Sequence, residues 1–158
     1  MAFQILLNVF LAFIWMFLKV STEPIDFFVG YFFGLLLLFT FRRFFPTRFY
    51  LVRVIAVINL IAIFIKELLL ANIAVLRVII KPKLDIQPGI FALSTDLNKD
   101  WEITLLSNLI TLTPGTLVVD ISDDNKILYI HAMDASDAEA AIASIKNTFE
   151  KAIMEVSR

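Results

Sequence analysis

The first eighteen residues, "MAFQILLNVFLAFIWMFL" from Met1 to Leu18, carry no charged side chain. A helix rises about 1.5 Å per residue, so this stretch is long enough to cross most of a hydrocarbon core about 30 Å thick. It lacks a basic beginning and a small-residue cleavage site, which makes a removed signal peptide the weaker interpretation. We therefore predict that the chain begins with a transmembrane helix.

A second uncharged run extends from Phe27 to Phe41. Pro24 suits the first turn of a helix, and Pro46 lies where such a helix would have to end. The two runs together predict a transmembrane hairpin over residues 1–50. Gly30 and Gly34 have the spacing that lets two helix backbones approach closely in lipid, so we expect a packing contact there, although chance also places glycines in membrane helices.

The two connectors of this hairpin differ in charge. The stretch "RRFFPTRFYLVR" carries four arginines and no acid, whereas "KVSTEPID" carries one lysine and two acids. Positive residues favour the cytoplasmic side of a membrane. We therefore expect the arginine connector and the N-terminus inside the cell, and the short connector outside.

The segment 51–83 is apolar but interrupted by Lys66 and Glu67. At 100° per residue four of its polar side chains fall within a sector of about 60°, with Glu67 close by, and form a basic stripe, which consists of Asn59, Lys66, Arg77 and Lys81. This favours an amphipathic helix, which can lie in the inner headgroup layer or pack along neighbouring transmembrane helices. The alternative is a third span, which would cost roughly 2.5–3.5 kcal/mol for burying the lysine and would send the rest of the chain outside.

The composition of the whole chain is that of a membrane protein, with 59% hydrophobic residues, a mean hydropathy of +0.84 and 18% charged residues. Nine basic and three acidic residues before Leu84 give a charge of +6, and five basic and twelve acidic residues from Leu84 onward give −7. A basic apolar half followed by an acidic half indicates a membrane anchor and then a water-exposed domain. Nucleic acid is an unsuitable partner for so acidic a domain.

Metal, cofactor and ion-path chemistry has few candidate groups in this sequence. There is no cysteine and only one histidine, so we expect neither a metal site nor a cofactor. Neither of the two uncharged runs contains Asp, Glu, Lys, Arg or His, which an ion or proton path at membrane depth requires. The chain is therefore not expected to transport ions by itself.

The segment 84–158 has the pattern of a small α+β domain. Pro82 and Pro88 prevent a continuous helix, and Ser136 with Glu139 forms a capping box that should open the last helix. Between them, alternating and helical patterns predict a strand, a helix and two further strands: "IFALST" (90–95), "DWEITLLSNLITL" (100–112), "TLVVDIS" (116–122) and "KILYIHA" (126–132). We thus expect a membrane α-helical anchor followed by a cytoplasmic domain of order β-α-β-β-α.

The motif "TPGT", consisting of Thr113, Pro114, Gly115 and Thr116, falls where the first helix of this domain should stop. Proline cannot continue the helix, and glycine supplies a turn with positive φ. The alternative is a phosphate cradle, but the P-loop lysine and its spacing are absent. We favour a structural joint that also offers a contact surface.

Asp120 and His131 are the other polar residues of note in this half. If Ser122 pairs with Ile127, the two lie diagonally on one face of the hairpin. A proton-handling pair is one interpretation, and an ordered, hydrogen-bonded hairpin is the one we favour. Asp134 is placed to cap the final helix.

The string S-N-x-x-T-L-T-P-G-T extends from Ser107 to Thr116. An apolar hairpin and "KPKLDIQPG" precede this string, and "LYIHAMD" follows it. With these features the chain resembles the E subunit of the multisubunit Mrp-type cation/proton antiporters of bacteria, and the string is the most specific part of the resemblance. The resemblance covers essentially the whole chain. It implies an accessory component of a seven-subunit complex in the plasma membrane that exchanges cytoplasmic sodium for external protons. In that family the ion path resides in the large A and D subunits.

The resemblance implies folding and docking roles, not catalysis, for the polar positions. Residues expected to be structural or to contact other subunits are Gly30, Gly34, Lys66, Thr113, Pro114, Gly115, Thr116, Asp120, His131 and Asp134. The expected partners are the other antiporter subunits and membrane lipid. A stand-alone membrane-anchored binding or sensor module is the alternative, and an enzyme is disfavoured because no acid, base and nucleophile converge.

Overall fold

The computed structural model describes residues 2–45, 48–82 and 86–157, which belong to two compact units, Met1–Ile55 and Ala56–Arg158. The division falls inside the long helix α3 (Tyr50–Ile80), whereas the sequence led us to expect three segments, 1–50, 51–83 and 84–158. The difference arises because Leu60, Ile63 and Phe64 of α3 pack against the core of the α+β unit. Pro46 and the expected boundary at residues 83 and 84 lie outside the described residues.

The first unit contains two apolar helices of 17 residues, α1 (Ala2–Leu18) and α2 (Pro24–Thr40), followed by a 3₁₀ turn (Arg42–Phe44). Pro24 occupies the first turn of α2, where its missing N–H costs nothing. The two helices pack along each other, and α2 presents its two glycines to α1. Aromatic contacts such as Phe13 with Phe27, at 5.3 Å between ring centroids, add to this packing.

Helix α3 is one continuous helix of 31 residues, about 46 Å long at 1.5 Å per residue. By length and composition it is the helix, among those described, that could cross a membrane. Leu60, Ile63 and Phe64 on one side of it pack against the core of the second unit. The helix therefore belongs to the α+β unit from Ala56 onward.

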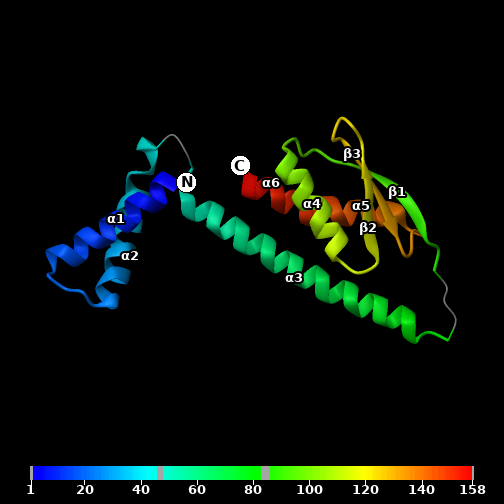
Figure 1. Ribbon diagram of the computed structural model, residues 1–158, viewed down its shortest axis with the longest axis horizontal. Coiled ribbons are helices and arrows are strands. Elements are labelled where there is room, and N and C mark those ends of the chain that lie inside the picture. The colour runs from blue at the N-terminus through cyan, green and yellow to red at the C-terminus, as the bar shows by residue number, and fades with distance from the viewer. Residues whose placement is uncertain (1, 46–47, 83–85, 158) are drawn as a thin grey trace. The chain divides into compact units, whose positions relative to one another are not determined.

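The second unit contains a three-stranded antiparallel sheet of order β1-β3-β2 (Figure 1). The strands and helices lie close to the segments that the apolar patterns predict, and their bounds are β1 (Gly89–Ser94), α4 (Asp100–Leu112), β2 (Thr116–Ile121), β3 (Ile127–Ala132), α5 (Ala138–Ile145) and α6 (Lys151–Ser157). A β-bulge lies between Val118 and Asp120, which bends the edge strand β2.

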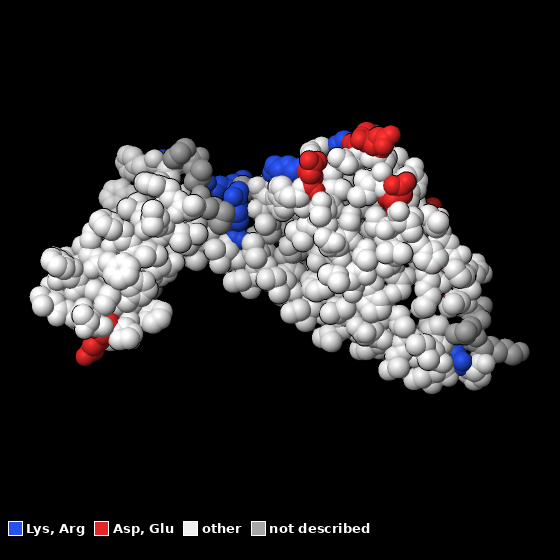
Figure 2. Space-filling model, viewed as in Figure 1, with Lys and Arg blue, Asp and Glu red and all other residues white. Residues whose placement is uncertain are grey.

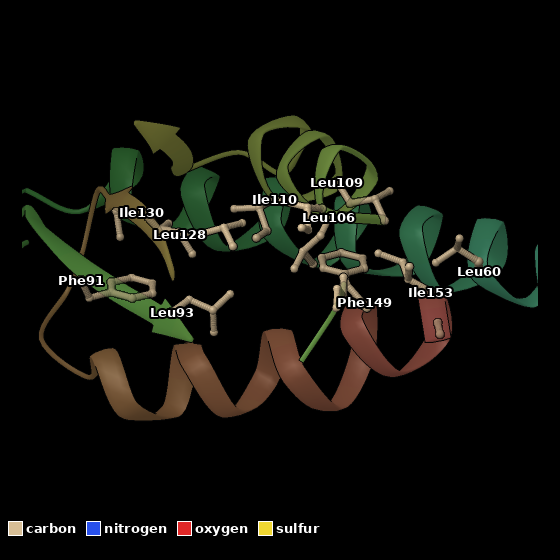
Figure 3. Close-up of a cluster of buried hydrophobic side chains, with 14 residues drawn as sticks. Leu60, Phe91, Leu93, Leu106, Leu109, Ile110, Leu128, Ile130, Phe149 and Ile153 are labelled. Carbon is tan, nitrogen blue, oxygen red and sulfur yellow. The ribbon is translucent and has the colours of Figure 1, made fainter. Parts of the chain in front are cut away.

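The core of this unit lies between one face of the sheet and the helices (Figure 3). Alternate residues of the strands point into it, as the period of a half-buried sheet requires. The buried side chains labelled in Figure 3 are Leu60, Phe91, Leu93, Leu106, Leu109, Ile110, Leu128, Ile130, Phe149 and Ile153. The other face of the sheet leaves apolar side chains exposed, namely Ile90, Leu117, Val119 and Tyr129.

The last helical segment differs from the expectation at both its start and its middle. Asp137, not Ser136, caps α5, because its carboxylate accepts the N–H of Ala140 at 3.0 Å. Asp134 does not cap the helix either, since its carboxylate accepts the N–H of Ser136 at 3.1 Å in the preceding turn. Between α5 and α6 the chain forms a π-helical turn over Lys146–Glu150, which buries the side chains of Phe149 and Glu150.

Candidate functional site

The "TPGT" segment forms the joint between α4 and β2. Gly115 adopts a φ of +95°, a conformation that favours glycine. The hydroxyls of Thr113 and Thr116 each donate to the Ile110 carbonyl oxygen at 2.7 Å, and the N–H of Met133 donates to the Gly115 carbonyl at 2.8 Å. The threonine hydroxyls thus close the C-terminus of α4, which is the structural use that the sequence favours over a phosphate cradle.

This joint faces helix α3 across a cavity of about 330 Å³. A Cβ on Gly115 would lie 3.7 Å from a methyl group of Val75 in α3, which shows how closely the two elements approach. The cavity is lined by twelve residues from α3, the joint, α4 and the last helices: Glu67, Leu70, Ala71, Ala74, Ile110, Thr113, Pro114, Thr116, Ala141, Ser144, Ile145 and Phe149. The joint therefore faces α3 of the same chain across this cavity, and a contact between the joint and another subunit stays a prediction.

Lys66 lies on α3 beside this cavity with 70% of its side chain exposed. Its ammonium group lies 3.5 Å from the carboxylate of Glu67, whose side chain is 23% exposed and lines the cavity. An exposed pair of this kind contributes little stability. Lys66 therefore remains available to an anionic group at the surface.

The two glycines of α2 lie against α1. A Cβ on Gly30 would stand 2.9 Å from the Ala12 carbonyl oxygen, and one on Gly34 would stand 2.1 Å from the Asn8 side-chain oxygen. Only glycine allows this approach without a shift of the helices. The packing contact that we expected at the glycines is made between α1 and α2 of this chain.

In the part of the chain that the structure describes, Asp120 and His131 do not form a hydrogen bond with each other. The bulge in β2 aligns Asp120 with Tyr129 and Leu117 with His131. The Asp120 carboxylate accepts the N–H of Ile121 at 2.8 Å. His131 is half-buried on the outer face of the sheet, with Ile90 opposite it on β1.

Asp134 stabilises the turn after β3, where its carboxylate accepts the N–H of Ser136. Hydrogen bonds from the backbone and the hydroxyl of Ser136 hold the pKa of Asp134 below its usual value. Among the described residues, no three His, Asp or Glu side chains are gathered as metal ligands would be.

Comparison with known proteins identifies the family. A family model described as "Na+/H+ ion antiporter subunit" matches residues 8–156. The chain belongs to this antiporter family. It is 65% identical to the E subunit of the Na+/H+ antiporter of Bacillus subtilis and 52% identical to that of Alkalihalophilus pseudofirmus, each over 158 residues and the full length of both chains. The resemblance that the sequence suggested is confirmed.

A solved structure is also similar to this chain. It is a chain of the membrane-bound sulfane sulfur reductase, an archaeal respiratory membrane complex, with 31% identity and a TM-score of 0.56. The similarity covers 95% of the present chain and 96% of the archaeal one.

The antiporter family to which this chain belongs consists of components of a membrane transporter, not of an enzyme.

The first unit contains a buried polar cluster that we did not predict. The amide of Asn8, fully buried, donates to the Tyr50 hydroxyl at 2.9 Å, and the hydroxyls of Tyr50 and Tyr31 lie 2.8 Å apart. The N–H of Tyr50 donates to the Gln4 side-chain oxygen at 2.8 Å. The signal in the sequence was the spacing of Gln4 and Asn8, which places two amides on one face of an apolar helix. The cluster ties α1 and α2 to the first residue of α3.

Two buried glutamates in the second unit hold the last helices to the loop after β1. The first, Glu102, is 5% exposed and accepts the N–H of Asn98 at 3.1 Å and that of Lys99 at 3.2 Å, as well as the hydroxyl of Ser157. Burial raises the pKa of Glu102, but these hydrogen bonds outweigh it and lower the pKa to about 2.

The second buried acid, Glu150, is 1% exposed. Its Oε1 accepts the Thr95 hydroxyl at 3.0 Å and the N–H of Asp96 at 2.6 Å. The π-helical turn directs this side chain inward. Neither glutamate was singled out from the sequence, because both lie within helical segments whose charges are typical of solvated faces.

Proposed function

We propose that the chain is an accessory subunit of a multisubunit Na+/H+ antiporter. In this proposal α1 and α2 span the membrane, α3 lies along its cytoplasmic surface and the α+β domain faces the cytoplasm. The chain supports the assembly and its cytoplasmic side, while neighbouring subunits carry the ions. The main support for the proposal is that one side of α3 packs on the α+β domain while the opposite side is apolar and exposed.

One side of α3 packs on the α+β domain, through Leu60, Phe64 and the cavity residues. The opposite side is apolar and exposed, and it consists of Ile58, Ile61, Ile65, Leu69, Ile73, Leu76 and Ile80. On the same side the amide of Asn72 donates to the Leu68 carbonyl at 2.7 Å, within the helix. Uncharged surface also dominates the visible length of α3 (Figure 2).

The basic stripe lies between these two sides. Lys66, Arg77 and Lys81 are exposed and fall about 80–140° from Ile58 around the helix. An interfacial helix has this arrangement, because its apolar side enters the acyl boundary while lysine and arginine reach the headgroups. A helix that crossed the bilayer here would draw the polar surface of its attached domain toward the hydrocarbon, at a high cost.

The orientation follows from the arginine connector. Arg42 and Arg43 follow α2, and the guanidinium of Arg42 lies 4.5 Å from the ring centroid of Phe39. This contact, with further arginines at 48 and 53, suits the cytoplasmic headgroup layer. The α+β domain then lies in the cytoplasm together with the N-terminus.

The absence of charge deep in the two spans supports an accessory role. Helix α2 begins at Pro24 and so includes Asp26, but Lys19 donates to that carboxylate at 3.1 Å at the end of the helix pair. The polar groups deeper in the unit are the amides and hydroxyls of Gln4, Asn8, Tyr31 and Tyr50, which are uncharged side chains. An ion path needs titratable groups along the membrane depth.

Other subunits of the antiporter are the proposed partners. The relatives are named as antiporter subunits, and the archaeal chain comes from a membrane complex. The apolar residues Ile90, Leu117, Val119 and Tyr129 on the open face of the sheet offer a surface that a neighbour would cover.

Affinity purification of a tagged chain in mild detergent tests the proposal. We expect several hydrophobic subunits to copurify, and we expect liposomes that contain this chain alone to show no Na+/H+ exchange. Recovery of a monomeric, folded chain that binds a small ligand would favour the sensor alternative. Exchange by the chain alone would refute the accessory role.

A further inference from the structure

We propose that the cavity between α3 and the α4–β2 joint binds one acyl chain of an anionic phospholipid, whose phosphate lies against Lys66 and Arg77. An accessory subunit of an antiporter does not require such a site. The inference rests, however, on the proposed position of α3 at the membrane surface.

The interior of the cavity suits an alkyl chain. Most of its wall is apolar, and its volume of about 330 Å³ lies at the lower end of the range for small-molecule sites. Thr113 and Thr116 already donate to the Ile110 carbonyl, and Glu67 lies near Lys66. Few polar groups remain to select a polar ligand, whereas each buried methylene stabilises a bound chain.

Leu70 lies at the edge of the cavity. This residue lines the cavity and is also 50% exposed, so it belongs both to the wall and to the surface of α3. Around the helix, Leu70 lies about 60° from Ile73 of the exposed apolar side, in the direction of the domain. A lipid at that apolar side can therefore reach the cavity without crossing the domain.

The rim beside Leu70 is basic. Lys66 precedes Leu70 by four residues and Arg77 follows it by seven, so all three fall on the same side of the helix, within about 40° of each other. Both charged side chains are exposed. A lysine and an arginine one to two turns from an apolar entrance suit a phosphate at the head of an alkyl chain.

An apolar side chain from a neighbouring subunit is the competing occupant. It would fill the cavity equally well, but it would not require the two cations at the rim. The place of Leu70 at both the cavity wall and the surface of α3 favours the lipid, and so do the two cations at the rim.

The test uses the purified antiporter complex in vesicles that contain phosphatidylglycerol with a photoreactive group near the end of one acyl chain. Peptide mass spectrometry then locates the crosslinks. Crosslinks to α5, at Ala141 or Ile145, are expected, because both residues line the cavity. Ala71→Leu, which fills the cavity, should reduce them about tenfold.

Matched variants distinguish a filled cavity from a misfolded chain. Ala62→Leu makes the same change on the exposed side of α3, about 180° away, and should leave the α5 crosslinks unchanged. Ala141→Leu fills the cavity from the opposite wall and should reproduce the loss if Ala71→Leu does not fold. Replacing Lys66 and Arg77 with glutamine should abolish the preference for phosphatidylglycerol over phosphatidylcholine in the crosslinks to α5.

The outcomes separate this inference from the proposed function. Crosslinks confined to the exposed side of α3 and unaffected by Ala71→Leu would overturn the lipid site while leaving α3 at the membrane. Crosslinks absent from α3 altogether would overturn its membrane position as well. A neighbouring subunit found crosslinked within the cavity would overturn the lipid site and assign the cavity to that protein.

Discussion

Gly34 of α2 lies directly against Asn8 of α1, so that a Cβ on Gly34 would stand 2.1 Å from the Asn8 side-chain oxygen. Asn8 is fully buried and cannot move aside without breaking its hydrogen bond to Tyr50. One glycine thus sets both the spacing of the two helices and the position of the polar cluster that ties them to α3.

Gly34→Ala should therefore destabilise the first unit by about 1–3 kcal/mol, the usual cost of forcing extra volume into a packed contact. Thermal unfolding of the purified chain in detergent measures the effect. Adding Asn8→Ala removes the obstructing side chain. The double variant should therefore lose less stability than the sum of the losses of the two single variants. Strict additivity would show that the contact does not limit the packing.

Tyr50→Phe removes the hydroxyl that lies between Asn8 and Tyr31. We expect a loss of about 1–3 kcal/mol, because the buried Asn8 amide then lacks its acceptor. Protease resistance and thermal unfolding of the chain in detergent report the loss. Tyr129→Phe, on the open face of the sheet, is the matched control and should change stability little. Equal effects of the two variants would contradict the role assigned to the cluster.

Gly115→Ala places a side chain at a φ of +95°. The expected cost is about 1 kcal/mol or more, because an L residue is strained there. Asn125 has a φ of +58° in the turn between β2 and β3, and Asn125→Gly should be close to neutral at this comparable position. Denaturant unfolding monitored through Trp101 compares the stabilities of the two variants. A Gly115→Ala variant as stable as the wild type would contradict a requirement for glycine in the joint.

Glu102 gives the α+β domain a pH-dependent contribution to stability. Its folded pKa of about 2 lies below the ordinary value of 4.5, so the contribution is fully present above pH 4.5 and is lost as the pH falls toward 2. A depression of this size corresponds to about 3 kcal/mol. The difference in unfolding free energy between the wild type and Glu102→Gln should shrink over this pH range. A difference that stays constant from pH 6 to pH 2.5 would contradict the low pKa.

Local patterns in the sequence were sufficient for the three strands and the first helix of the α+β domain and for its joint. Alternation marks β1 and β3, and Pro114 with Gly115 marks the end of α4, because turn chemistry depends on neighbouring residues alone. The family was also recognisable from Ser107 to Thr116.

Features that depend on distant residues were not predictable in this way. Tyr50 meets Asn8 across 42 residues, and no local pattern reveals that contact. The choice of Asp137 over Ser136 as the helix cap depended on the exact start of α5, since both residue types cap helices well. Helix α3 is apolar on two sides, so its composition alone could not separate an interfacial helix from a span.

The proposed function depends above all on the position of α3 at the cytoplasmic surface, and labelling of single cysteines tests that position most directly. The natural chain has no cysteine, so Thr22→Cys reports the short connector and Lys151→Cys reports the α+β domain, both at exposed positions. With a membrane-impermeant reagent on intact cells, we expect Thr22→Cys to be labelled and Lys151→Cys to be labelled only after the membrane is opened. Labelling of both positions from outside would mean that α3 crosses the membrane.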